Sequence, residues 1–364
     1  MIQKYLCVWT LLFWGIQVMA QLSSPDEFLP HRIGETFPHH HQIIDYFEHV
    51  AANSSSVQLK QYGMTNEDRP LVVAYLSAPE NMARLEQIRT NHLRKAKMIE
   101  GDADTDENIA VVWLSFGVHG NEAAASSTAP YVLHQLADPN NQAAQNWLKN
   151  TLVIIDPALN PDGYARYTQW YRQMAHRIVQ PELNSREHRE PWPGGRSNHY
   201  YFDLNRDWAW STQLETKQRL AVYHQWLPHI HVDVHEQGIN SPYYFAPAAK
   251  PYHAYITSWQ RDFQKSIGEN HARYFDEKGW LYFTKEIFDL LYPSYGDTYP
   301  MFNGAIGMTY EQGGSSRAGR AVLADTGDTL TLKDRIQHHT TTAISTVETA
   351  SKYAEHLNRN FEQY

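Results

Sequence analysis

Phe116-Gly117-Val118-His119-Gly120-Asn121-Glu122 is the stretch around which this sequence is organised. An apolar run, residues 109–114, leads into it and predicts a buried strand, and a helix-prone run, residues 122–136, follows. His119 and Glu122 therefore lie at the C-terminal end of a strand, where open α/β sheets place their active sites. If the chain turns helical here, residues three apart face the same side. One imidazole nitrogen and one carboxylate can then meet at a single point, which predicts two ligands of a zinc site.

Strands alternate with helices along most of the chain. The predicted strands are 57–62, 71–76, 109–114, 152–155, 229–234 and 305–310, the first two forming a hairpin, and the predicted helices are 42–52, 81–99, 122–136, 141–150, 212–226, 253–278 and 331–364. This alternation indicates an α/β fold with a largely parallel sheet. Asn160-Pro161-Asp162-Gly163-Tyr164 is typical of a turn, and residues 166–201 are predicted to form a long irregular loop, a kind that is usually functional.

Residues 1–20 predict a secretory signal that is cleaved from residues 21–364, which are expected to form one domain. Lys4 precedes an apolar run, residues 5–18, and Val18-Met19-Ala20 supplies the small residues of a cleavage site. A transmembrane anchor is the alternative, but the apolar run is short and no basic flank follows it. We therefore expect a secreted protein, in a bacterial periplasm or outside the cell, that is not inserted in the membrane once the signal is removed.

Net charge and cysteine content restrict the partners and the metal ligands. The formal net charge of −9 becomes −10 when Lys4 leaves with the signal, which argues against a nucleic-acid partner. The single cysteine, Cys7, also lies within the predicted signal. The mature chain then has no disulfide and no thiolate, so a metal site has to use His, Asp and Glu.

His235 is the best candidate for the third zinc ligand. In residues 230–235, His231, Asp233 and His235 alternate with apolar residues, so this strand buries one face and presents polar groups on the other. A hydrogen-bonded core histidine is the alternative interpretation, but the other two ligand types are already present in the chain. Two His and one Glu leave an open position on the metal for a water, which zinc acidifies until it can attack a carbonyl.

Five elements that carry these residues follow one another in a fixed order. They are His119-Gly-Asn-Glu122, Asn160-Pro-Asp-Gly163, Asp203-Leu-Asn-Arg206, His235 and Glu311. In this order and spacing the chain resembles the zinc carboxypeptidase family typified by carboxypeptidases A and B, in a bacterial secreted form. The resemblance implies a single α/β domain whose mixed, mostly parallel, twisted sheet has helices on both faces. It also implies one Zn²⁺ per chain and a peptide substrate with a free C-terminus, cleaved at its C-terminal peptide bond.

The resemblance also implies roles for the residues that match the family's motifs. His119, Glu122 and His235 would hold the zinc, and Glu311 would be the general base that takes a proton from the attacking water. The next motif, Asp203-Leu-Asn-Arg206, would supply the groups that bind the carboxylate of the substrate. Asn205 and Arg206 would hold this carboxylate, since a planar guanidinium such as that of Arg206 matches a carboxylate. Asp203 would orient a zinc-binding histidine.

The resemblance implies two further roles, and for each role the sequence offers two candidate residues. An arginine that polarises the scissile carbonyl is expected after the Asn-Pro-Asp-Gly element and beside a tryptophan, which favours Arg172 over Arg166. A mobile tyrosine that contacts substrate is expected in a Tyr-x-x-x-Gly pattern, which Tyr292 matches, with Tyr295 as the rival. Both residues of each pair can instead pack as ordinary structural side chains.

Three other functions remain in competition with removal of C-terminal residues from peptides. The first is a carboxypeptidase that acts on cell-wall stem peptides, which also end in a free carboxylate. The second is a zinc deacylase of N-acyl amino acids, similar to the aspartoacylase and desuccinylase group, which shares the His-Gly-Asn-Glu and Asp-Leu-Asn-Arg elements. The third is a binding module without catalysis, against which the presence of Glu311 argues, because a binder needs no base.

Overall fold

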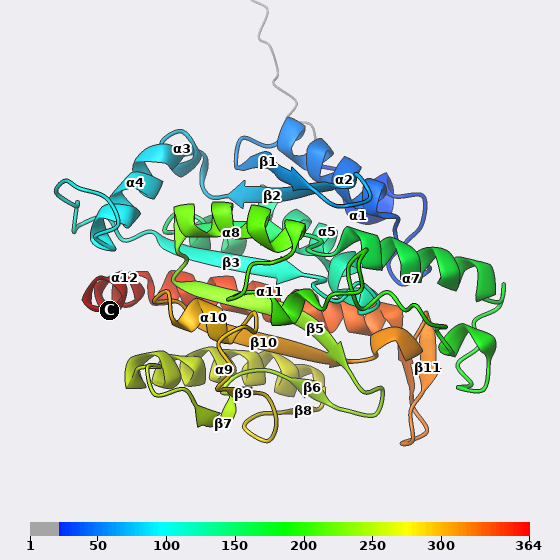
Figure 1. Cartoon of the computed structure of the whole chain (residues 1–364). Helices are drawn as coiled ribbons and strands as arrows, with labels where there is room; N and C mark the ends of the chain where they lie inside the picture. The colour runs from blue at the N-terminus through cyan, green and yellow to red at the C-terminus, as the bar shows by residue number, and fades with distance from the viewer. Residues whose placement is uncertain (1–21) are drawn as a thin grey trace, which may run out of the picture.

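Eight strands form the central sheet of this protein, whose computed structural model describes residues 22–364 (Figure 1). The predicted secretory signal, residues 1–20, lies outside the described residues. The strand order is β1-β2-β4-β3-β5-β10-β6-β8. The strands are β1 (Val57–Met64), β2 (Pro70–Leu76), β3 (Ala110–Phe116), β4 (Thr151–Asp156), β5 (Ile230–Gln237), β6 (Tyr243–Tyr244), β8 (Tyr282–Phe283) and β10 (Ile306–Gly313).

The four central strands, β4, β3, β5 and β10, run parallel to one another. β1 and β2 form the predicted hairpin, and β2 and β6 add antiparallel pairs at either side. In the register of β5 and β10, His235 is paired with Glu311. The parallel strands therefore bring their carboxyl ends, with the candidate site residues, to one edge of the sheet.

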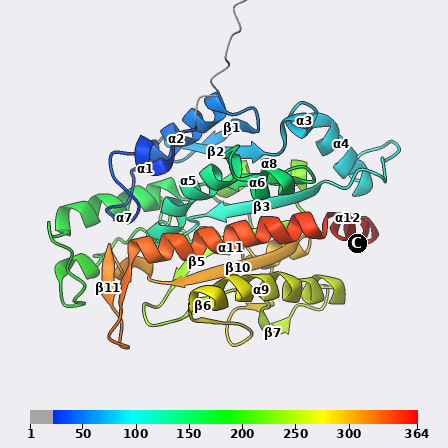
Figure 2. The ribbon, with the colours of Figure 1, turned by 180° about the vertical axis from the view of Figure 1, so that it is seen from behind.

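Helices cover both faces of this sheet, as predicted (Figures 1 and 2). One face packs against α2 (His40–Asn53), α5 (Ala123–Ala137), α9 (Ser258–Lys278) and α11 (Leu332–Lys352), and the other against α8 (Leu214–Trp226). In β3, Val112 and Leu114 enter the first core, whereas Val111 and Trp113 enter the second. A strand that is buried on both faces is apolar throughout, which is why residues 109–114 form a continuous apolar run.

The Asn160-Pro-Asp-Gly element does not form the predicted turn but begins a helix, α7 (Pro161–Met174). Asn160 is its N-cap, and its side-chain oxygen accepts a hydrogen bond from the backbone N–H of Gly163 at 3.0 Å. Proline suits the first position of a helix because its missing N–H has no partner there in any case. The same residue types serve turns and helix starts, so the predicted loop begins about one helix later, after Met174.

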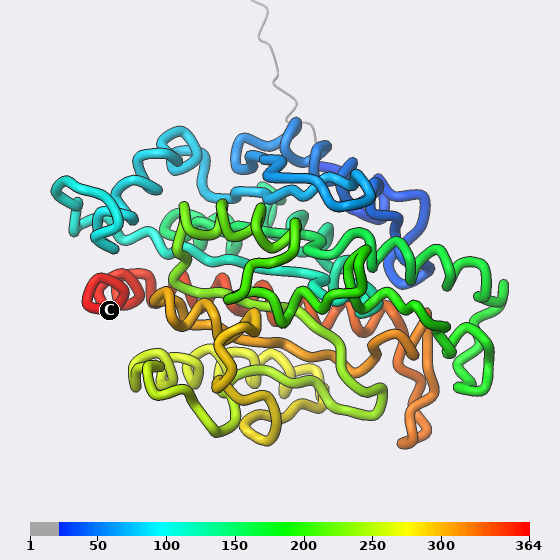
Figure 3. The backbone as a smooth tube through the Cα atoms, in the orientation of Figure 1, coloured from blue at the N-terminus to red at the C-terminus, as the bar shows by residue number. Residues whose placement is uncertain are grey.

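Two predicted helices are interrupted, and several short elements were not predicted (Figure 3). Residues 81–99 hold α3 (Pro79–Met82) and α4 (Leu85–Lys95), and the C-terminal helix breaks at Tyr353 before α12 (Ala354–Gln363). The helix predicted at 141–150 is α6 (Gln142–Trp147). The short elements that were not predicted include α1 (Pro25–Phe28), α10 (Thr298–Met301), β7 (Ala249–Tyr252), β9 (Asp289–Leu290), β11 (Ala321–Leu323) and β12 (Thr329–Thr331). Within residues 22–364, none of the helices combines the length and the apolar character needed to cross a bilayer.

Candidate metal centre and active site

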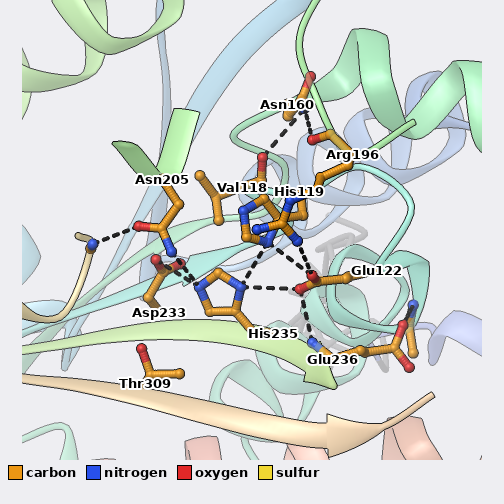
Figure 4. A network of polar contacts seen from close by, with 12 residues as sticks. Val118, His119, Glu122, Asn160, Arg196, Asn205, Asp233, His235, Glu236 and Thr309 are labelled. Carbon is orange, nitrogen blue, oxygen red and sulfur yellow. Dashed lines mark hydrogen bonds and ion pairs between the residues drawn. The ribbon is translucent and has the colours of Figure 1, made fainter. Parts of the chain in front are cut away.

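His119, Glu122 and His235 meet at the carboxyl ends of β3 and β5 (Figure 4). His119 follows β3, Glu122 is the N-cap of α5, and His235 lies in β5. The two oxygens of Glu122 lie 2.8 Å from His119 Nδ1 and 3.0 Å from His235 Nδ1. Within residues 22–364 this is the one group of three metal-ligating side chains whose ligand atoms all converge.

The second nitrogen of each imidazole faces a carboxylate. Nε2 of His119 lies 3.0 Å from Asp203 Oδ1, and Nε2 of His235 lies 2.9 Å from Asp233 Oδ2. A carboxylate beside Nε2 favours the tautomer that carries its proton there, which leaves the lone pair on Nδ1, the atom that faces Glu122. These Nδ1 atoms lie only 3.2 Å apart. Two imidazole nitrogens and a carboxylate that face one point could hold a metal ion, and this donor set suits Zn²⁺.

The turn that carries His119 is packed too tightly for side chains at its glycines. Gly117 has φ +69°, and a Cβ on Gly120 would lie 2.1 Å from the backbone nitrogen of Tyr164. Asn160 holds this turn from the outside, because its amide donates to the carbonyl oxygen of Val118 at 3.3 Å and to that of Arg196 at 3.0 Å (Figure 4). The start of α7 thus positions both the His119 turn and the loop that carries Arg196.

Glu311 lies beside His235 on the neighbouring strand, and both line a cleft of about 400 Å³. Its Oε2 is buried and has no hydrogen-bond partner. Burial raises the pKa of Glu311 to about 8. The charge of His235 lowers this pKa, whereas the negative charges of Glu122 and Asp233 raise it further. An unpaired carboxylate with a raised pKa in a cleft is a candidate for proton transfer.

Asp203, Asn205 and Arg206 reach the same site from a 3₁₀ turn, Leu204–Arg206. Asp203 loses solvation there, but its hydrogen bond to His119 and the charges of His119 and Arg196 lower its pKa. The Asn205 amide lies 3.2 Å from His235 Nε2 and accepts from the N–H of Gly296 at 2.7 Å. The Arg206 side chain is 48% exposed, so its guanidinium is available to a ligand in the cleft.

The structure does not bring Arg172 to this cleft. Its guanidinium donates to the carbonyl oxygen of Phe37, near the C-terminal end of α7. Arg196 lines the cleft instead, with Nη1 3.2 Å from Glu122 Oε1 and Nη2 3.1 Å from Asp203 Oδ2. The arginine predicted to polarise the carbonyl, Arg172, thus lies outside the cleft, and Arg196 occupies a place at the metal-ligand cluster. Residues 166–174 are helical rather than looped, which directs Arg172 away from the site.

Tyr295 rather than Tyr292 lines the cleft. The guanidinium of Arg206 lies over the ring of Tyr295, 4.5 Å from its centre. Tyr292 lies behind it, with the ring centres 4.9 Å apart, and its hydroxyl accepts from the indole N–H of Trp210 at 2.9 Å. The rival of the predicted tyrosine is thus the one that a ligand would meet.

Two polar groups at the site were not predicted, although each had a signal in the sequence. Asp233 stands two residues before His235, on the same face of the strand that the alternation had marked as polar. Arg196 follows Gly194-Gly195 and precedes the Asp203 motif by seven residues, in the loop whose length had indicated function. Only the folded chain shows that this loop passes over Glu122.

Comparisons with known proteins agree with this arrangement. The sequence matches the family described as zinc carboxypeptidase over residues 43–229. The probable carboxypeptidase 2 of Arthroderma benhamiae is 26% identical over 125 residues, which make up 34% of this chain and only 18% of that protein.

Solved structures share the fold at low sequence identity. A metallo-carboxypeptidase from Burkholderia cenocepacia superimposes with a TM-score of 0.60 at 14% identity, covering 86% of this chain and 69% of that one. The carboxypeptidase A of Helicoverpa armigera gives a TM-score of 0.56 at 14% identity, covering 94% and 76%. With the family match extending over half of the sequence and with His119, Glu122 and His235 gathered at one point, this chain belongs to the zinc carboxypeptidase family.

Proposed function

We propose that this chain is a zinc-dependent carboxypeptidase that hydrolyses the C-terminal peptide bond of peptides. The observation that carries the proposal is one cleft that joins three groups: the metal-ligand cluster, the unpaired carboxylate of Glu311 and the exposed guanidinium of Arg206. A hydrolase that recognises a free C-terminus needs all three. A binding module has no use for a buried, unpaired base.

The metal ligands in this proposal are His119, Glu122 and His235, for one Zn²⁺ per chain. When bound, zinc polarises the scissile carbonyl and acidifies a water. Asp203 and Asp233 lie beside the two Nε2 atoms and would hold the imidazoles with Nδ1 toward the metal. The protein thereby orients the ligands before the ion binds.

Glu311 is proposed as the general base and then the general acid. Its carboxylate accepts a proton from the attacking water and delivers it to the nitrogen of the leaving amino acid. Arg196, whose guanidinium lies between Glu122 and Asp203, is proposed to donate hydrogen bonds to the oxygen on which negative charge develops.

Asn205 and Arg206 are proposed to bind the substrate's terminal carboxylate, with Tyr295 stacked on Arg206. Arg206→Ala should lower kcat/KM about 100-fold for peptides with a free C-terminus, because a hydrogen-bonded charge pair is lost. Kinetics on matched peptides with free and amidated C-termini measure this. Equal losses on both kinds of peptide would show that Arg206 does not read the carboxylate.

A mass-spectrometric digest of a peptide library with free and amidated C-termini tests the activity itself. We expect stepwise loss of C-terminal residues from the free peptides alone, abolished by dialysis against a chelator and restored by zinc. Activity that survives complete metal removal would contradict the zinc mechanism. Cleavage confined to N-acyl amino acids would identify a deacylase, and cleavage confined to stem peptides would identify a cell-wall enzyme.

Residues 1–20 are proposed to direct export, leaving residues 21–364 as a single catalytic domain outside the cytoplasm. The apolar run and the small residues at 18–20 support this. N-terminal sequencing of the protein recovered from culture medium or periplasm should begin at Gln21. A first residue of Met1 in the exported protein would contradict cleavage.

A further inference from the structure

A buried ion pair lies directly behind the metal-ligand cluster. Glu236 follows His235 in β5, and Arg335 lies in the first turns of α11. Arg335 Nη1 is 2.7 Å from Glu236 Oε1, and both side chains are 0% exposed. Removing two charges from water is costly, and buried ion pairs can often be replaced by apolar residues without loss of stability. Stability alone therefore does not account for this pair.

Two hydrogen bonds connect Glu236 to the segment that carries the metal ligand Glu122. The backbone N–H of Glu236 donates to Glu122 Oε2 at 2.9 Å. In return, the backbone N–H of Ala124, in the first turn of α5, donates to Glu236 Oε2 at 3.2 Å. Because Glu122 is the N-cap of α5, the position of that first turn sets the position of the Glu122 carboxylate relative to His235 in β5.

Arg335 allows Glu236 to occupy this place as a carboxylate. Glu122 and Glu311 already concentrate negative charge here, and a third carboxylate without a partner would repel them. Arg335 also donates to the carbonyl oxygen of Gly319, in the segment that follows β10. This segment closes tightly on the pair, since a Cβ on Gly314 would lie 2.3 Å from Glu236 Oε1.

We propose that Glu236 and Arg335 are positioning residues that hold the first turn of α5 against β5, at the spacing a metal ion requires between Glu122 and His235. The inference rests on the proposed function only in taking His119, Glu122 and His235 as the ligands. Groups that orient metal ligands commonly contribute 10–100-fold to metal affinity. Removing the Glu236 carboxylate should therefore weaken zinc binding without touching a ligand.

Zinc affinity of the full chain, measured by competition with a chromogenic chelator, tests this directly. Glu236→Ala should weaken zinc binding about 10–100-fold. Glu236→Gln should recover most of this affinity, because its amide oxygen still accepts from Ala124. Arg335→Met should also weaken zinc binding, because it leaves Glu236 charged and unpaired.

The matched control is Glu107→Gln, which removes the carboxylate paired with Arg84 near the start of β3, at the opposite end of the strand from His119. It should leave zinc affinity unchanged. Circular dichroism and thermal unfolding of the metal-free proteins identify variants that remain folded.

A folded Glu236→Ala protein with the parent's zinc affinity would overturn the proposal and leave the pair a purely structural one. If Glu236→Ala does not fold, Arg335→Met decides, and parental affinity in that variant overturns the proposal equally. If the parent protein itself binds no zinc, the proposed function is overturned. That outcome is distinguishable from the two above, in which the parent binds zinc and the variant binds it equally well.

Discussion

Glu311→Gln is expected to lower kcat about 1,000-fold while zinc remains bound, since a positioned acid–base group contributes 10²–10⁴-fold. The substitution keeps the shape of the side chain but removes its capacity to take a proton. Glu311 Oε2 is buried without a partner, whereas each of the other carboxylates that line the cleft has one. Glu122 contacts a metal-ligand histidine, Glu236 contacts Arg335, Asp297 accepts from the Thr309 hydroxyl, and Asp289 accepts from the backbone N–H of Leu291. Glu311 is therefore the carboxylate in this cleft best placed to transfer a proton.

The experiment combines steady-state kinetics on a free C-terminal peptide with the zinc content of the purified variant. Glu107→Gln, far from the cleft at the start of β3, serves as the control and should retain the parent's kcat. A Glu311→Gln protein that holds zinc and turns over within tenfold of the parent would exclude Glu311 as the base. A variant that has lost its zinc would instead show that Glu311 contributes to metal binding.

Arg196→Met is expected to lower kcat about 100-fold with a smaller change in KM, whereas Arg172→Met should leave both nearly unchanged. Removal of a donor that stabilises a developing negative charge typically costs 10²–10³-fold in kcat. The guanidinium of Arg196 lies at the metal-ligand cluster, 3.2 Å from Glu122, whereas that of Arg172 is bonded to Phe37 at the far end of α7.

Arg196 also contacts Glu122 and Asp203, so its replacement could lower kcat indirectly, through loss of the metal. The zinc content of the variant separates that indirect loss from the loss of a donor to the carbonyl oxygen. A variant that keeps its zinc and its unfolding temperature but loses kcat supports the role on the carbonyl oxygen. Normal kcat in Arg196→Met together with a large loss in Arg172→Met would reverse the assignment and favour the arginine expected from the family's spacing.

Much of the fold could be predicted because its strands and helices have distinct hydrophobic periods. The apolar run of β3 and the alternation in β5 lie in the predicted strands, and the mixed, mostly parallel sheet with helices on both faces is confirmed. The errors fall where local signals are ambiguous. Asn160 and Pro161 suit a turn and a helix start equally, and two-residue strands such as β6 form only because a partner strand is present.

The metal-ligand cluster was also predictable, because its residues are tied to strand ends by short, fixed spacings. His119 and Glu122 are three residues apart, and the register between β5 and β10 aligns His235 with Glu311. Arg196 has no such tie to a strand. It lies in a loop whose position depends on Asn160, 36 residues earlier, and no spacing rule relates the two.

By itself, the sequence determined the fold class, the family and the candidate metal ligands, because these depend on the order of elements and on residues a few positions apart. The tertiary structure alone decided which arginine and which tyrosine enter the cleft, Arg196 and Tyr295 rather than Arg172 and Tyr292. It also decided that Glu236 is paired with Arg335 across 99 residues of chain. The physical reason is that a loop or a buried charge takes its place from contacts between distant segments, which no local pattern encodes.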